Sequence, residues 1–304
     1  MGARKEFTYP SSDGAHQVHA VLWLPERGEA RGVVQLVHGI SEYILRYDPF
    51  ARYLTEHGFA VTGNDHLGHG QTAKDPSEYG YFNDWWNLVH DVRALWLKTK
   101  ESYPQAPYFL LGHSMGSFVA RTYLIDYPGS LTGAILSGTG QEPAALVSLG
   151  KLVTGVGDPR KVNKLFAAFS LGAYNKQFKP NRTSADWICR DERVVDAYLA
   201  DSLCNFLPKA GMNHAMMSGL QYVGSRKNLE RMDRDLPVYF FAGDKDPVGA
   251  GGQGVKKVAG WFREAGVKDV TVKLYPGGRH EMLNETNREE VFADTLAWIE
   301  KHLG

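Results

Sequence analysis

Residues 108–116 read Tyr-Phe-Leu-Leu-Gly-His-Ser-Met-Gly, an apolar run that leads into the pattern Gly-x-Ser-x-Gly. The four apolar residues predict a buried strand, and the helix-compatible stretch 118–124 follows the second glycine. A serine at such a sharp strand-to-helix turn holds its hydroxyl above the sheet, and the flanking glycines avoid collisions within the turn. The stretch therefore predicts that Ser114 is a nucleophile.

Strands and helices alternate on both sides of this turn. Apolar runs predict strands at 17–24, 33–37, 59–63, 133–136, 238–242 and 270–275. Helical spacing of apolar residues predicts helices at 47–57, 85–100, 255–265 and 289–302. This alternation is typical of a mostly parallel sheet that helices cover, so the fold class is α/β.

Residues 140–231 break the alternation. The apolar segments there have helical spacing, and they lie at 144–153, 162–171, 194–199 and 212–222. No stretch of this region has a strand pattern. We therefore expect a core formed by residues 1–139 and 232–304, with a helical insertion at 140–231.

Composition and charge narrow the class of protein. The chain has 304 residues with 34 Lys+Arg and 34 Asp+Glu, so it has no basic excess and no nucleic-acid partner is expected. No apolar run approaches the ~20 residues that span a bilayer, and the first residues lack the apolar core of a signal peptide. The two cysteines, Cys189 and Cys204, are too few for a disulfide scaffold and favour a cytoplasmic location.

A serine hydroxyl needs a general base, and histidine is the usual one because its pKa lies near neutrality. In the chain order Ser–Asp–His, three histidines follow Ser114. His214 lies in the insertion and His302 near the C-terminal end. His280 follows the last predicted strand, on a loop that should open at the same sheet edge as Ser114. His280 is therefore the predicted base.

The acid that orients this histidine is expected after the strand at 238–242, where Gly243-Asp244-Lys245-Asp246 follows. Spacing alone does not separate Asp244 from Asp246.

The oxyanion hole needs two backbone N–H groups. One is expected from Met115, the residue after the nucleophile. The other is expected from Ile40, in the loop after the third strand, His38-Gly39-Ile40-Ser41-Glu42.

Neither a cofactor nor a metal site is expected. The glycine-rich stretch 247–254 lacks the Lys-Ser/Thr ending of a phosphate-binding loop. His66 and His69 are three residues apart, but no third ligand follows at a suitable spacing. We interpret both as structural histidines that form hydrogen bonds.

Five motifs together resemble the monoacylglycerol lipase and lysophospholipase branch of the α/β-hydrolases. They are His38-Gly39-Ile40-Ser41-Glu42 with Arg46-Tyr47, Asp65-His66-Leu67-Gly68-His69-Gly70-Gln71, Gly112-His113-Ser114-Met115-Gly116, Gly243-Asp244-Lys245-Asp246-Pro247-Val248 and Gly278-Arg279-His280-Glu281-Met282-Leu283-Asn284-Glu285. The resemblance covers nearly the whole chain. It implies the α/β-hydrolase fold, Asp246 as the acid, and a mobile helical cap at 140–231 over an acyl-binding tunnel.

The chain departs from the family pattern at three positions. The oxyanion loop of the family is usually H-G-x-G-E-H, and here Ser41 replaces the second glycine and Tyr43 the histidine. Ser117 stands after the Gly-x-Ser-x-Gly motif, where a further glycine is common. None of these changes removes a predicted catalytic group.

The expected activity is that of a serine carboxylester hydrolase, working through Ser114, His280 and Asp246 and an acyl-enzyme intermediate. The resemblance implies a single-chain lipid ester, foremost a monoacylglycerol, as substrate. A lysophospholipid or a short-chain ester is the alternative. Amide or peptide cleavage and a receptor that binds without turnover are further alternatives, because a fold does not settle function.

Apolar residues at helical spacing mark the insertion: Leu146, Leu149, Leu152, Val153, Leu165, Phe166 and Phe169. One interpretation is packing on the core. The other is a face that lines the tunnel or makes transient contact with a membrane surface.

Overall fold

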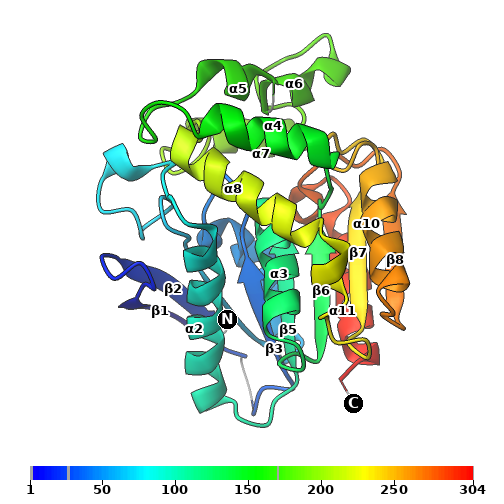
Figure 1. Ribbon diagram of the computed structural model, residues 1–304. Coiled ribbons are helices and arrows are strands. Elements are labelled where there is room, and N and C mark those ends of the chain that lie inside the picture. Colours follow the sequence, from blue (N-terminus) through cyan, green and yellow to red (C-terminus); the bar gives the residue numbers. More distant parts are fainter. Residues whose placement is uncertain (1–2, 26–27, 170, 304) are drawn as a thin grey trace.

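An eight-stranded sheet forms the centre of the computed structural model (Figure 1), in the order β1-β2-β4-β3-β5-β6-β7-β8. The structure describes residues 3–25, 28–169 and 171–303, without the side chains of residues 169 and 171. The strands are β1 (Arg4–Pro10), β2 (Gln17–Trp23), β3 (Val33–Val37), β4 (Ala60–Asn64), β5 (Tyr108–His113), β6 (Gly133–Ser137), β7 (Val238–Gly243) and β8 (Val270–Tyr275). β2 pairs antiparallel with β1 and β4, and the remaining pairs are parallel. The predicted mostly parallel sheet is confirmed.

Helices cover both faces of this sheet, and each face has its own apolar cluster. One cluster contains side chains of α2 (Trp85–Ser102), α3 (Met115–Asp126) and α10 (Gln253–Glu264). The other contains side chains of α1 (Asp48–Glu56) and α11 (Arg288–Lys301). Because both faces are covered, β3 and β5 are buried at every position, as expected for central parallel strands.

Among the described residues, the segment between β6 and β7 forms helices and no strand. These helices are α4 (Ala144–Thr154), α5 (Lys164–Phe169), α6 (Leu171–Tyr174), α7 (Glu192–Ala200), α8 (Ala210–Val223) and α9 (Arg226–Leu229). Figure 1 shows α4 to α8 at the end of the sheet where the parallel strands finish. We call residues 140–231 the cap. α8 packs on both α4 and α3, so it joins the cap to the helical layer of the core.

Side-chain caps fix where several helices begin. Asp84 accepts the Trp86 N–H at the start of α2, at 2.9 Å. Asn163 accepts the Phe166 N–H at 3.0 Å, so α5 begins at Lys164. The helix expected at 162–171 therefore begins two residues later than predicted, at Lys164. Short 3₁₀ helices complete the chain: η1 (Ile44–Tyr47), η2 (Pro76–Glu78), η3 (Asn175–Phe178) and η4 (Met282–Asn284).

The sequence did not predict β1. Only Tyr9 of its seven residues is buried, so the strand lacks the apolar alternation that marks a half-buried strand. The Tyr9 hydroxyl donates to the backbone oxygen of Asp91 at 2.8 Å, which attaches this edge strand to α2.

Two further findings concern the membrane and the cysteines. In the part of the chain that the structure describes, no helix is long and apolar enough to cross a bilayer. Cys189 and Cys204 are both buried free thiols.

Candidate active site

Ser114 occupies the turn between β5 and α3. Its backbone has φ 52° and ψ −122°, a region that residues with a side chain rarely adopt. A Cβ added to Gly112 would lie 2.4 Å from Gly116 O, and one added to Gly116 would lie 2.1 Å from Val37 O. Both flanking positions therefore require glycine, as the motif predicts.

His280 follows β8, and its Nδ1 lies 2.9 Å from Asp246 Oδ1. Asp246 is fully buried, and its Oδ1 also accepts the Val248 N–H at 2.9 Å. Asp244 instead accepts the Gly277 N–H at 2.8 Å. Of the two carboxylates that spacing left equivalent, Asp246 is thus the one that contacts the histidine.

Burial and charge act in opposite directions on His280. Burial alone would lower the pKa of its imidazole, but the nearby carboxylates, Asp246 foremost, together outweigh burial and hold that pKa above its ordinary value. The rings of His113 and Trp187 pack on the imidazole, with ring centroids 4.6 and 5.0 Å away. The ring of His280 is therefore oriented by a carboxylate and confined by two aromatic neighbours.

Ser114 and His280 line the same small pocket, of about 30 Å³. No hydrogen bond joins the two side chains among those of the described residues. Catalytic hydrogen bonds are often long without substrate and tighten when it binds. The other histidines after Ser114 have different partners, since His214 contacts Lys151 O and His302 contacts Asp269.

The two predicted oxyanion donors border a second, larger cavity together with Ser114. Met115 is the first residue of α3, so its N–H is one of the donors that a helix leaves free at its start. Within the described ranges, no backbone partner is found for the N–H of Ile40 or of Met115. Both donors are thus available to a bound ligand.

The amides on either side of Ile40 are already engaged. Gly39 N–H donates to Glu42 Oε1 at 2.6 Å, and Ser41 N–H donates to His69 Nε2 at 3.3 Å. The loop is therefore held at both neighbours of Ile40.

Three buried histidines, His38, His66 and His69, pack together beside this loop. The ring centroid of His38 lies 4.1 Å from that of His66 and 5.2 Å from that of His69. Burial lowers the pKa of all three, to about 4 for His69, so the rings are neutral. A neutral ring can accept, and His38 Nε2 accepts the His66 N–H at 3.0 Å. These contacts agree with a structural role for His66 and His69.

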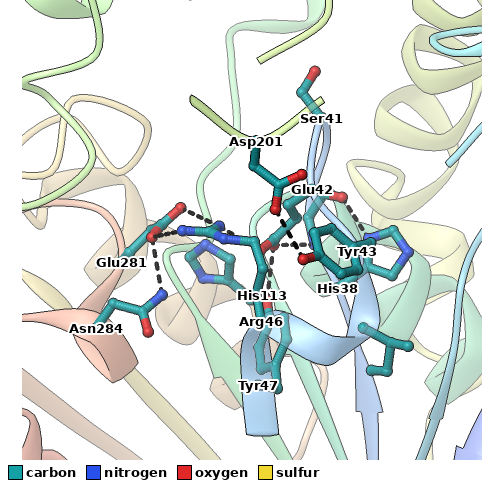
Figure 2. A network of polar contacts seen from close by, with 12 residues as sticks. His38, Ser41, Glu42, Tyr43, Arg46, Tyr47, His113, Asp201, Glu281 and Asn284 are labelled. Atoms are coloured by element: carbon teal, nitrogen blue, oxygen red, sulfur yellow. Dashed lines mark hydrogen bonds and ion pairs between the residues drawn. The ribbon is translucent and has the colours of Figure 1, made fainter. Parts of the chain in front are cut away.

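Figure 2 shows a buried polar network next to this site, centred on Arg46. Its guanidinium donates to both oxygens of Glu281 at 2.7 Å and to Glu42 Oε2 at 2.8 Å. Glu42 Oε1 also accepts the Tyr47 hydroxyl at 2.8 Å, and Asn284 donates to Glu281 at 2.9 Å. Because Glu281 directly follows His280, Arg46 links the oxyanion loop to the histidine loop.

One guanidinium faces two buried carboxylates in this network, so their pKa values separate. Burial raises both, but Arg46 outweighs burial at Glu281 and lowers its pKa to about 2. At Glu42 burial prevails, with added repulsion from Glu281, and the pKa stays raised. The sequence motifs contain Arg46 and Glu281, but no local pattern signals a contact across 235 positions.

The larger cavity has a volume of about 570 Å³ and lies between Ser114 and the cap. Core residues Ile40, Met115 and Phe118 form one wall. The cap residues expected at helical spacing form the other, and those that line it are Leu146, Leu149, Val153, Leu165 and Phe166. Leu152 instead is 68% exposed, and the Phe169 side chain lies outside the described residues.

The chain is similar to known hydrolases. Residues 28–287 match the family model Hydrolase_4, described as serine aminopeptidase S33. The chain is 30% identical to a monoacylglycerol lipase of Mycolicibacterium smegmatis, over 99% of this chain and 98% of that protein. It is 26% identical to the monoglyceride lipase of Homo sapiens, over 91% of this chain and 84% of that protein.

Two solved structures extend the comparison. A highly thermostable carboxyl esterase from Bacillus coagulans, in complex with glycerol, has a TM-score of 0.92 and 31% identity over the whole of both chains. A soluble variant of monoglyceride lipase from Saccharomyces cerevisiae, in complex with a substrate analog, shares the fold with a TM-score of 0.79. That likeness is 21% identical and covers 100% of this chain and 96% of the other. With a family match over most of its length, this chain belongs to the α/β-hydrolases of the serine aminopeptidase S33 family, and it is a carboxylic ester hydrolase of the serine type.

Proposed function

We propose that this chain hydrolyses single-chain lipid esters, with a monoacylglycerol as the expected substrate. The cavity of about 570 Å³ carries the proposal, because Ser114 forms part of its otherwise largely apolar wall. That volume lies within the roughly 300–1,000 Å³ of ordinary small-molecule sites. Each methylene that leaves water in such a cavity contributes about 0.8 kcal/mol. A long acyl chain therefore matches the wall in both size and chemistry.

We infer a mechanism that starts at Ser114. As its Oγ attacks the ester carbonyl, His280 Nε2 takes the hydroxyl proton, and Asp246 stabilises the resulting imidazolium through Nδ1. The N–H groups of Ile40 and Met115 hold the oxyanion of the tetrahedral intermediate. His280 then gives its proton to the departing alcohol, and the acyl group remains on Ser114. Water, deprotonated by His280, releases the fatty acid and restores the serine.

The charges beside the small pocket favour a neutral leaving alcohol. Glu42 and Glu281 contribute to its wall beside Ser114, against the single cation of Arg46. A phosphate head group would meet like charge there, whereas glycerol hydroxyls can donate to carboxylates. This is the reason to place a monoacylglycerol ahead of a lysophospholipid.

The outer part of the cavity suggests how such a substrate arrives. Leu146, Leu149 and Leu165 line the cavity and are also more than half exposed, so they form its rim. We propose that this rim makes transient contact with a membrane surface, and that residues 140–231 form the cap over the core of 1–139 and 232–304. The cytoplasmic location stays a prediction from the sequence.

Fatty-acid release from a long-chain monoacylglycerol tests the proposal, with wild type and Ser114→Ala compared. Release that vanishes in the variant supports the nucleophile and the substrate class together. Wild type should prefer this substrate over a lysophosphatidylcholine and a butyrate ester of equal concentration. A preference for either of the latter would replace monoacylglycerol by that alternative.

Peptide or amide cleavage is the second candidate, and the description of the matched family as serine aminopeptidases favours testing it. An ester and an amide with the same acyl group separate the two reactions. We expect the ester to be cleaved at least 100-fold faster. A fluorophosphonate probe separates both from a receptor without turnover, because only an activated Ser114 is labelled.

A further inference from the structure

The oxyanion loop, residues 38–43, forms hydrogen bonds to the cap at two of its residues. Ser41 Oγ donates to Phe206 O at 2.7 Å, and Asn205 N–H donates to Ser41 O at 3.1 Å. The Tyr43 hydroxyl donates to Asp201 Oδ2 at 2.8 Å, as Figure 2 shows. These are the two loop positions at which the sequence departs from its family pattern.

Ser41 forms hydrogen bonds both to the cap and to the core. It directly follows Ile40, and its N–H donates to His69 on the core side. Its φ is 58°, a left-handed conformation that is unfavourable for a residue with a side chain. A glycine would avoid that cost, so the hydrogen bond to Phe206 O is what the serine hydroxyl adds.

The cap segment 201–206 has hydrogen bonds within itself and packs on the core through Phe206. Asp201 accepts the Leu203 N–H at 2.9 Å, and its backbone oxygen accepts the Cys204 N–H at 3.0 Å. The Phe206 ring stacks on Tyr79 and packs against His69, with centroid distances of 5.5 and 5.2 Å. Because His69 holds Ser41 N–H, the loop, the cap segment and the core histidine form a closed ring of contacts.

We propose that Ser41 and Tyr43 are positioning residues that hold the Ile40 N–H in place only while the segment 201–206 is docked. The inference rests on the proposed function, in which that N–H binds the oxyanion. Gly39 is held by Glu42, and Ser41 is held by the core and the cap together. The Ile40 N–H lies between these two residues, so its direction depends on how both of them are held. Displacement of the cap segment therefore weakens transition-state stabilisation, whereas acyl-chain binding depends on the larger cavity, which no residue of 201–206 lines.

A matched pair of tyrosines tests this coupling. Tyr222 on α8 donates its hydroxyl to Asp126 on α3, so it too joins cap to core by a tyrosine–aspartate bond, but outside the oxyanion loop. Tyr43→Phe should lower kcat about 3- to 10-fold for both a butyrate and a palmitate ester, with KM unchanged. Tyr222→Phe should leave kcat unchanged. The loss should stay below the ~10²–10³-fold that follows removal of an oxyanion donor.

The affinity for an inhibitor that forms a tetrahedral adduct separates a positioning role from simple attachment of the cap, because attachment alone would not change that affinity. A trifluoromethyl ketone should bind Tyr43→Phe more weakly by the same factor as kcat falls, whereas the affinity for free palmitate should not change. Asp201→Asn, which keeps an acceptor oxygen, should retain more activity than Asp201→Ala. Ser41→Gly combined with Tyr43→Phe should lower kcat further, to about one thirtieth of wild type.

Two outcomes would overturn the proposal. One is an equal loss of kcat in Tyr43→Phe and Tyr222→Phe, and the other is a change confined to KM for long chains. Thermal unfolding of each variant checks that the fold persists. Failure of the proposed function looks different, because wild type itself would then release no fatty acid.

Discussion

The two walls of the candidate site differ in what holds them. On the core side, Ser114, Asp246 and His280 are all buried, and directional hydrogen bonds hold the Asp246 carboxylate, the His280 ring and the Ser114 backbone. On the cap side, Leu146 and Leu149 are exposed leucines that offer only apolar surface. Bond-breaking groups need a fixed geometry, whereas apolar burial has no direction. We therefore expect core changes to alter the rate for every substrate, and cap changes to alter the choice among substrates.

The largest effect should come from the core, at the acid. Asp246→Asn removes the negative charge that stabilises the His280 imidazolium and should lower kcat about 10⁴-fold. Asp244, the matched control two residues away, accepts the Gly277 N–H and pairs with Lys245 at 3.7 Å, so Asp244→Asn should cost less than about tenfold. Steady-state kinetics on a short and a long ester measure both. A larger loss in Asp244→Asn would assign the acid to Asp244.

Arg46 should matter for stability as well as for rate. Arg46→Met leaves the buried Glu42 and Glu281 without their cation, which typically costs about 3–5 kcal/mol. Urea unfolding measures the loss, and Arg46→Met with Glu281→Gln should recover part of it. Arg231→Met breaks the more exposed pair with Asp126 and should cost under about 1 kcal/mol. Equal costs in the two arginine variants would contradict a special role for the buried network.

A substitution in the cap should instead affect long-chain substrates more than short-chain ones. Leu149→Asp places a charge in the cavity wall, so kcat/KM should fall about tenfold or more for a palmitate ester and less than twofold for an acetate ester. Leu152→Asp is the control, because that side chain is exposed and does not line the cavity. Monomeric substrate keeps membrane effects out of the assay. Equal losses on both esters would rule out a role in acyl-chain binding.

The smallest expected effect is a shift in pH dependence. His280 must be neutral to act as a base, so kcat/KM rises as pH rises through its pKa. Glu281 is among the carboxylates that raise this pKa, after Asp246. Glu281→Gln should therefore lower the pKa and move the acid limb to lower pH. Asp91→Asn, a buried carboxylate hydrogen-bonded to the β1–β2 turn, should leave the limb in place. A shift to higher pH would reverse the assigned sign.

The sequence predicted the features of the site that depend on neighbouring residues, and it did not predict those that depend on how distant segments fold together. The turn at Ser114 was readable because strand, glycines and helix are adjacent in the chain. Asp244 and Asp246 could not be separated by spacing, because the difference lies in how their loop folds against His280. The role of each residue in catalysis stays a prediction that the variants above address.

Contacts between distant segments left no signal in the sequence. Arg46 meets Glu281 across 235 positions, and Tyr43 meets Asp201 across 158. Neither pair has a spacing rule, since only the folded sheet and cap bring them together. β1 went unpredicted for a different reason, because one buried side chain in seven is too little periodicity.

The attachment of Ser41 and Tyr43 to the segment 201–206 bears on how this protein can be recombined with its relatives. A cap that only covered a cavity would be a module, exchangeable at its two junctions near residues 140 and 231. Here a crossover at those junctions also cuts three hydrogen bonds to residues 41 and 43. A chimaera should therefore keep its turnover only when the loop 38–43 and the cap come from the same parent.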